Sequence, residues 1–180
     1  MYGAQRPNRT MLYLVIGLGA AMVIALILFV LSVLGGSGRS DITTLTVRAD
    51  NLQALAEASQ KRIKSQDLGS INVDTNLLTS SDSTKLHSIL LKKFGIKNVP
   101  SNIIKNELDT DSDQKLKDAE LLNKFDLAYR QLLRDKIASV LTLARKIQAE
   151  TGDKNVNQAV ATIITNLTTI DKQLAALSLQ

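Results

Sequence analysis

An uninterrupted apolar stretch near the N-terminus constrains this chain more than any other feature. Residues 11–34, MLYLVIGLGAAMVIALILFVLSVL, contain no charged side chain. A helix of that length is about 36 Å long and can cross the ~30 Å hydrocarbon core of a bilayer with some tilt. The apolar region of a signal peptide is shorter, about 7–15 residues, and it ends at a small-x-small cleavage site. The stretch therefore predicts an uncleaved transmembrane helix that attaches the rest of the chain to a membrane.

Basic residues on the two sides of this stretch predict its orientation. The short polar tail at residues 1–10 carries Arg6, Arg9 and the terminal amine, whereas Arg39 and Arg48 follow on the far side. Lys and Arg near a span favour the cytoplasmic side, and two arginines against two is nearly a tie. The amine and the closeness of Arg9 to the span favour a cytoplasmic N-terminus. We therefore expect a single-pass cell-membrane protein with an extracytoplasmic C-terminal domain.

Small residues recur within the apolar stretch. Gly17, Ala21 and Ala25 are spaced four residues apart and share one face of the predicted helix. Such faces let two transmembrane helices approach closely, so self-association or docking to another membrane subunit is one hypothesis. Lipid-facing helices also contain many Gly and Ala residues, and this alternative stays open. After the stretch, GGSGRS at residues 35–40 predicts a flexible hinge before a domain at residues 41–180.

The composition excludes several classes of function. The chain contains no cysteine, which excludes disulfides, thiolate metal sites and cysteine nucleophiles. All 17 acidic residues lie at or after Asp41, and with 19 Lys and Arg residues that part has a net charge of only +2 (19 − 17). Its only aromatic residues are Phe94, Phe125 and Tyr129. Because nucleic-acid-binding surfaces concentrate basic and aromatic side chains, we expect no nucleic-acid partner.

Apolar residues at helical spacing predict the first and last long helices of the domain. The first covers residues 41–66, and the last follows Gly152 with Asp153 as its N-cap. Both stripes alternate steps of three and four residues, which places them on one helix face. The positions are Ile42, Leu45, Ala49, Leu52, Ala56, Ser59 and Ile63 in the first helix, and Val156, Val160, Ile163, Leu167, Ile170, Leu174 and Leu177 in the last.

A third long helix is predicted between these two. It begins at Asp111 or Ser112 and runs to about Glu150, with a wide apolar face that indicates at least two neighbouring helices. The short link from Thr151 to Asp153 makes it an antiparallel neighbour of the last helix. Its apolar positions are Leu122, Phe125, Tyr129, Leu133, Ile137, Val140, Ala144 and Ile147, widened by Leu121, Ala128, Leu132 and Leu141.

Residues 67–111 show the weakest periodicity. We expect short helical pieces here, one of them ending at Gly95 in a left-handed conformation and another following Pro100. The sequence as a whole predicts an all-α protein: a transmembrane helix followed by an antiparallel helical bundle of three long helices plus short helical segments.

An acidic segment has the spacing of a calcium-binding loop. Asp109, Asp111, Asp113 and Glu120 occupy the first, third, fifth and twelfth positions of an EF-hand pattern. The sixth position, which requires glycine for a sharp turn, is Gln114. The alternative is that Asp111 and Gln114 form a variant capping box and that the acidic residues oppose the helix dipole. These carboxylates are the only metal candidate, and we expect no other cofactor.

Catalytic residue patterns are not found in the sequence. His87 is the only histidine, and we expect a partly exposed packing residue because no second histidine can complete a zinc site or a proton relay. Ser112 and Lys115 form a Ser-x-x-Lys pair without its companion motifs, and Ser112 is expected to lie at a helix start. We therefore expect a protein that is not an enzyme.

These observations predict a membrane-anchored interaction or scaffold subunit of an envelope-associated assembly. Its partners would be the lipid bilayer and a protein, or a second copy of the chain, bound through the transmembrane helix or a face of the bundle. The alternative is a membrane-tethered, sensor-like module that binds a small molecule or an ion between its helices. An internal pocket lined by polar groups would favour the ligand-binding module, and an exposed apolar patch would favour the scaffold.

Overall fold

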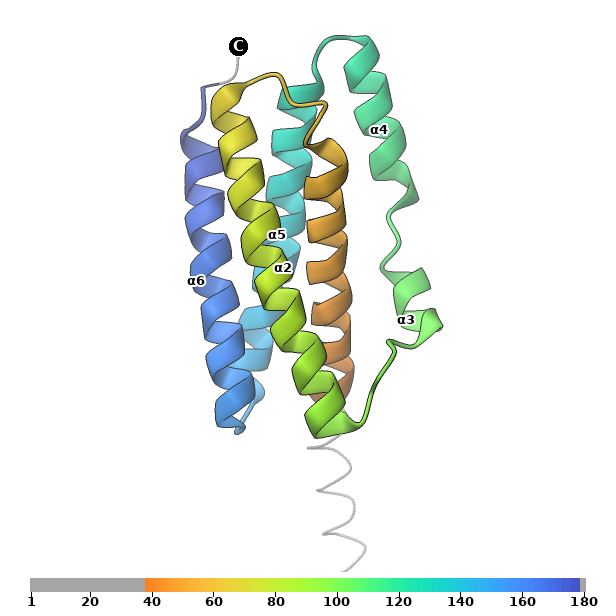
Figure 1. Cartoon of the computed structure of the whole chain (residues 1–180), viewed down its shortest axis with the longest axis vertical. Helices are drawn as coiled ribbons and strands as arrows, with labels where there is room; N and C mark the ends of the chain where they lie inside the picture. The colour runs from red at the N-terminus through yellow and green to blue at the C-terminus, as the bar shows by residue number, and fades with distance from the viewer. Residues whose placement is uncertain (1–37, 179–180) are drawn as a thin grey trace, which may run out of the picture. The chain divides into compact units, whose positions relative to one another are not determined.

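The computed structural model describes residues 38–178 (Figure 1). These residues form helices joined by turns, with no strand among them, so the predicted all-α fold is confirmed for this part of the chain. None of the helices described here is long and apolar enough to cross a bilayer. The transmembrane helix predicted at residues 11–34, with its face of small residues, lies outside the described residues.

The four long helices of the described residues are the one at residues 38–59, α2, α5 and α6, and they lie side by side in a bundle (Figure 1). The helix at residues 38–59 and α6 run in one direction, and α2 and α5 run in the opposite direction. The helix at residues 38–59 contacts α2 and α5, and α6 contacts the same two helices, so every neighbouring pair is antiparallel. The labelled helices are α2 (Gln66–Phe94), α3 (Ser101–Asn106), α4 (Thr110–Leu121), α5 (Phe125–Glu150) and α6 (Lys154–Ala176).

The packing of α5 against α6 confirms the predicted apolar stripes. Asp153 is the N-cap of α6, and its carboxylate accepts hydrogen bonds from the backbone N–H groups of Asn155 and Val156. From Phe125 onward, the central stripe predicted for the third helix is buried, together with Leu141, while Ala128 and Leu132 at its side are partly buried. The α6 stripe is buried from Val156 to Leu174. The first predicted stripe is buried from Ile42 to Ser59, and its last member, Ile63, is partly buried beyond the end of the helix. The apolar stripes of three of the four bundle helices are thus confirmed, although two of these helices have different bounds.

The prediction of one continuous helix from Asp111 or Ser112 to Glu150 is wrong, because the structure divides this segment into α4 and α5. Asn123 has a φ of 55° in the left-handed region. Its N–H donates to Glu120 O, and the Lys124 N–H donates to Ala119 O at 2.8 Å, which is a Schellman ending. Asn tolerates this conformation better than most residues. The apolar periodicity hid the break because Leu121 and Leu122 continue it in the sequence.

The region expected to be irregular instead contains the longest described helix, the 29-residue α2. Its start is capped by Ser65, so the preceding helix ends at residue 59 and not near residue 66. The expected stop at Gly95 is confirmed by its φ of 65°. The face of α2 that is buried is largely polar, which explains the weak apolar pattern; its polar members are Asn72, Thr75, Thr79, Asp82 and Ser83.

A helical crossover connects α2 to α5. Because α2 and α5 run in the same direction, the chain must return along the length of the bundle between them (Figure 1). It does so through α3 and α4, which lie on one outer side of the bundle. We call residues 95–124 the crossover. The crossover contributes little to the core, since α3 has no buried residue and α4 buries only Ser112 and Leu116.

We expect Leu133→Ala to lower the free energy of unfolding by about 2–5 kcal/mol, because Leu133 is fully buried in the core and its removal leaves a cavity. Leu77→Ala is the matched control, since the Leu77 side chain is 70% exposed, and its effect is expected within roughly 0.5 kcal/mol. Urea denaturation monitored by circular dichroism measures both. Equal losses in the two variants would contradict the burial described here.

The left-handed residue between α4 and α5 provides a second prediction. Asn123→Ala should lower the free energy of unfolding by about 1 kcal/mol, because a Cβ disfavours a positive φ that Asn tolerates. Asn123→Gly should be neutral or slightly stabilising. Urea denaturation of the two variants tests this order, and a more stable Ala variant would indicate that α4 and α5 form a continuous helix.

Candidate functional site

A cleft lies between the helix at residues 38–59 and the crossover, and we call it the crossover cleft. Its volume is about 240 Å³. Helix 38–59 forms one wall and the segment from Leu108 to Leu116 forms the other, with Lys136 of α5 at the edge. The lining residues are Asn51, Ala54, Leu55, Ala58, Ser59, Arg62, Leu108, Asp109, Ser112, Asp113, Leu116 and Lys136.

The most buried polar group in this lining is the Ser59 hydroxyl. Ser59 is 1% exposed. The Tyr129 hydroxyl donates its own proton to Asn72 Oδ1, and its oxygen can accept from Ser59, whose hydrogen bond acts to lower the Tyr129 pKa. The Ser59 hydroxyl therefore interacts with the buried Tyr129 of the bundle core.

Ion pairs surround the mouth of the cleft. Asp109 pairs with Lys136, and hydrogen bonds from Lys136 and from Ser112 hold the pKa of the Asp109 carboxyl well below its usual range. Arg62 lies 2.7 Å from Glu120, and its guanidinium also stacks 4.3 Å from the centre of the Phe125 ring. The charged groups at the mouth thus already have partners within the protein.

The candidate calcium ligands do not converge. Asp109 is the N-cap of α4 and accepts a hydrogen bond from the Ser112 N–H at 3.0 Å, so the segment that follows is a helix and not an EF-hand loop. Asp113 pairs with Lys117 at 2.6 Å, while Glu120 pairs with Arg62. Across residues 38–178, no group of three or more acidic or histidine side chains is placed to hold a metal ion. The predicted capping box of Asp111 and Gln114 is wrong, because the N-cap is Asp109 and the Gln114 amide donates to Asp118. Asp111 and Asp113 do lie in the first turn of α4, as the helix-dipole argument expects.

His87 belongs to a small polar cluster on the outside of the bundle. Its Nε2 lies 3.0 Å from Asp50 Oδ2, and the Ser83 hydroxyl donates to the other oxygen of the same carboxylate. Both side chains therefore bind Asp50 and not each other, which is the wrong order for a histidine that activates a serine. The His87 side chain is 45% exposed, as the sequence predicted, but its partner on the neighbouring helix could not be deduced from spacing.

A buried polar network joins three helices of the bundle, and the sequence analysis missed it. Tyr129 of α5 donates to Asn72 of α2, and Asn72 Nδ2 donates to the backbone oxygen of Ala56 at 2.9 Å. All three residues are fully buried, and burial raises the pKa of the Tyr129 hydroxyl. The network gives each buried group a defined partner, and its role is structural.

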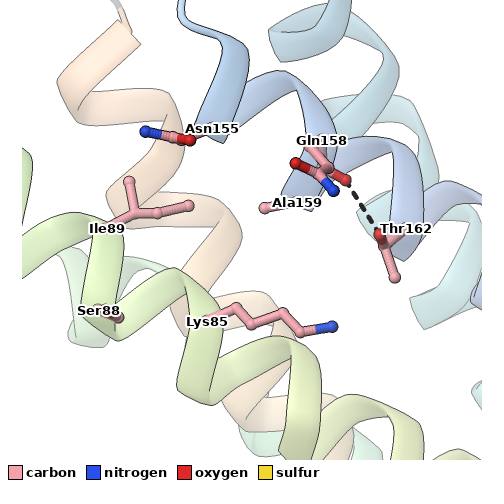
Figure 2. Close-up of a pocket in the computed structure, with 7 residues that line it drawn as sticks. All are labelled: Lys85, Ser88, Ile89, Asn155, Gln158, Ala159 and Thr162. Atoms are coloured by element: carbon pink, nitrogen blue, oxygen red, sulfur yellow. Dashed lines mark hydrogen bonds between the residues drawn. The ribbon is translucent and has the colours of Figure 1, made fainter.

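A groove between α2 and α6 is shown in Figure 2. It has a volume of about 340 Å³, and Lys85 extends along it from α2 in the direction of Thr162 on α6. A neighbouring depression of about 420 Å³ shares Ser88, Ile89 and Asn155 with it. The groove is an open surface feature that combines amide, hydroxyl and lysine groups with small apolar side chains.

Exposed apolar side chains are concentrated in the sequence of the crossover and the start of α5. Of eight large apolar residues that are strongly exposed in the described part of the chain, five lie between residues 104 and 127: Ile104, Leu108, Leu121, Leu122 and Leu127. Leu121 is 84% exposed and Leu122 is 67% exposed, at the turn between α4 and α5. We call these two adjacent leucines the crossover apolar patch.

The fold thus defines a four-helix bundle with one long helical crossover connection. Comparisons with protein-family models, with curated proteins and with solved structures give no match.

Asp82 provides a test of the buried polar face of α2. Burial raises the pKa of its carboxyl, while a hydrogen bond from Asn166 and the charge of Lys85 act in the opposite direction. A raised pKa means that the folded state holds this proton to a higher pH than the unfolded state, so the Asp82 contribution to stability decreases as pH rises through that window. Above that window the Asp82 carboxyl is charged, and burial of this charge lowers the stability of the folded state relative to the unfolded state.

We therefore expect Asp82→Asn to raise the thermal midpoint at pH 7, because the amide can still accept from Asn166 without carrying a buried charge. The difference from the unaltered protein should shrink as the pH is lowered toward 3.8, the ordinary pKa of the group. Asp74→Asn, on the exposed face of the same helix, is the control and should not reproduce this pH-dependent gain. Thermal melts between pH 3 and 8 measure both variants.

Proposed function

We propose that this protein is a membrane-anchored, non-enzymatic interaction subunit that docks a protein partner on the crossover apolar patch. The observation that carries the proposal is the strong exposure of the two adjacent leucines, Leu121 and Leu122, at the turn between α4 and α5. Concentrated exposed apolar surface favours association, because burying it against a partner removes it from water.

The length of the crossover supports an interaction role. The 29 residues of α2 span about 43 Å as a helix, and an extended chain of about 13 residues would bridge that distance. The crossover uses residues 95–124 instead and forms two helices from them, although α3 buries no residue. The crossover is thus longer than the connection from α2 to α5 requires, and its helices add little to the core. A role as a binding surface would explain the additional residues.

The patch lies at the end of the bundle away from the start of helix 38–59. The turn between α4 and α5 is at that end (Figure 1). Helix 38–59 alone is about 33 Å long. A partner on the patch therefore contacts the bundle at the end opposite to the first described residues.

Paired substitutions in the full-length chain test the proposal. Leu121→Glu with Leu122→Glu places two charges in the patch, whereas Val73→Glu with Leu77→Glu makes the same change at exposed positions of α2. After crosslinking in native membranes, mass spectrometry quantifies partners recovered in stoichiometric amount. We expect the amount of partner recovered with the first variant to fall about tenfold or more, since each unfavourable 1.4 kcal/mol weakens binding tenfold.

The control variant should retain the partner. A second copy of this chain counts as a partner in this measurement. Equal recovery from the two variants, or no stoichiometric partner for the unaltered chain, would contradict docking through the crossover apolar patch.

A further inference from the structure

We propose that one end of the bundle, which we call the basal end, binds anionic lipid headgroups at a membrane surface. The start of helix 38–59, the end of α2, the end of α5 and the start of α6 lie together at this end (Figure 1). We define the basal end as residues 38–43, 89–98 and 145–159. The inference rests on the membrane anchor of the proposed function, and it specifies which part of the bundle contacts the lipid.

The basal end carries the whole net positive charge of the described residues. It contains seven Lys and Arg residues and three acidic residues, a net charge of +4 (7 − 3). The other described residues contain 13 Lys and Arg residues and 14 acidic residues, a net charge of −1 (13 − 14). The seven basic residues, all of them exposed, are Arg39, Lys92, Lys93, Lys97, Arg145, Lys146 and Lys154.

Two of the three acidic groups at this end are already paired with a lysine beside them. Asp41 lies 2.8 Å from Lys146, and Asp153 lies 2.8 Å from Lys93. The other five basic residues have no ion-pair partner within residues 38–178, and the third acidic residue, Glu150, is the only one left to oppose them. The positive charge of the basal end is therefore available to an anionic partner.

The side chains around these charges favour lipid over nucleic acid. Sites for single-stranded nucleic acid combine basic groups with aromatic side chains on which bases stack. The only aromatic residue of the basal end is Phe94, which packs against the core. Leu91 is 53% exposed in the last turn of α2, beside Lys92. Apolar and basic side chains together are typical of surfaces that enter the headgroup region of a bilayer.

The length of chain before residue 38 also favours a bilayer as the partner. The apolar stretch ends at residue 34, four positions before the described residues begin. A chain of four residues extends over at most about 14 Å. A bilayer that holds the span predicted at residues 11–34 is thus within reach of the basal end, where each Lys or Arg close to anionic headgroups adds to the attraction.

Fluorescence quenching in the full chain tests the contact. Because the chain contains no cysteine, one introduced thiol can carry a fluorescent probe. Asn98→Cys places the probe at the basal end, and Gln66→Cys places it at the start of α2, at the opposite end; both positions are exposed. The labelled chain is reconstituted in phosphatidylcholine vesicles with and without phosphatidylglycerol. Both kinds of vesicle contain a trace of lipid with a nitroxide headgroup, which quenches a probe that lies against the headgroups.

We expect quenching at position 98 to rise about twofold or more when phosphatidylglycerol is present at about 0.05 M salt, because the basic residues are attracted to the anionic surface. The rise should disappear at about 0.5 M salt, since salt screens these charges. Quenching at position 66 should be equal in the two kinds of vesicle. A short DNA duplex, added at the same phosphate concentration as the phosphatidylglycerol, should leave the quenching at position 98 unchanged.

Two triple variants of the Asn98→Cys chain assign the effect to the basal end. The basal variant neutralises three exposed lysines of this end and should lose the rise, whereas the control variant neutralises three exposed lysines of the opposite end and should keep it. The substitutions are Lys92→Gln, Lys97→Gln and Lys154→Gln in the basal variant, and Lys61→Gln, Lys124→Gln and Lys172→Gln in the control variant.

Three results would overturn the inference: equal quenching at position 98 in the two kinds of vesicle, a rise that persists in the basal variant, or a rise that the DNA duplex removes, which would indicate a nucleic-acid surface. An alkaline carbonate wash of the same vesicles measures the membrane anchor separately. A chain that the wash removes would contradict the anchor of the proposed function, while the quenching recorded before the wash still decides whether the basal end binds headgroups.

Discussion

The packing of α5 against α6 is the interaction on which the rest of this bundle depends. Both helices carry a continuous stripe of aliphatic side chains, and only residues 151–153 separate them in the chain. A short link brings the two stripes together at a small cost in loop entropy, so this pair can form from local sequence alone. Helix α2 packs against α6, and an ion pair between Asp41 and Lys146 connects the helix at residues 38–59 to α5. Both helices therefore pack on the core that α5 and α6 form.

The direction of the helices imposes the second constraint. Because α2 and α5 are parallel, the chain between them must travel the length of the bundle, and it does so outside the core. A segment in that position makes contact with the bundle on one side only. The crossover therefore creates both the cleft against helix 38–59 and the exposed leucines of its outer surface, and the two candidate sites have a common origin in topology.

The polar interior of α2 shows how the bundle obtains a defined arrangement. Asn72 binds both Tyr129 and the backbone of Ala56, and Asp82 binds Asn166. Buried polar groups are unfavourable unless they are paired, so a shifted alignment of the helices would leave these groups without partners. The apolar stripes provide the driving force for packing, and the polar pairs favour one alignment of α2 over others.

The amino-acid sequence by itself determined the all-α class, the caps at Asp153 and Gly95, and the apolar stripes of three bundle helices, because these follow from local spacing and backbone preference. It also predicts a membrane span at residues 11–34, which remains a prediction. Only the tertiary structure decided that α2 is a bundle helix, since its buried face is polar and only partners distant in sequence make that burial favourable. The same holds for the ion pair of Asp109 with Lys136 and for the cleft beside the crossover. Both depend on which helices become neighbours, and spacing along one helix does not contain that information.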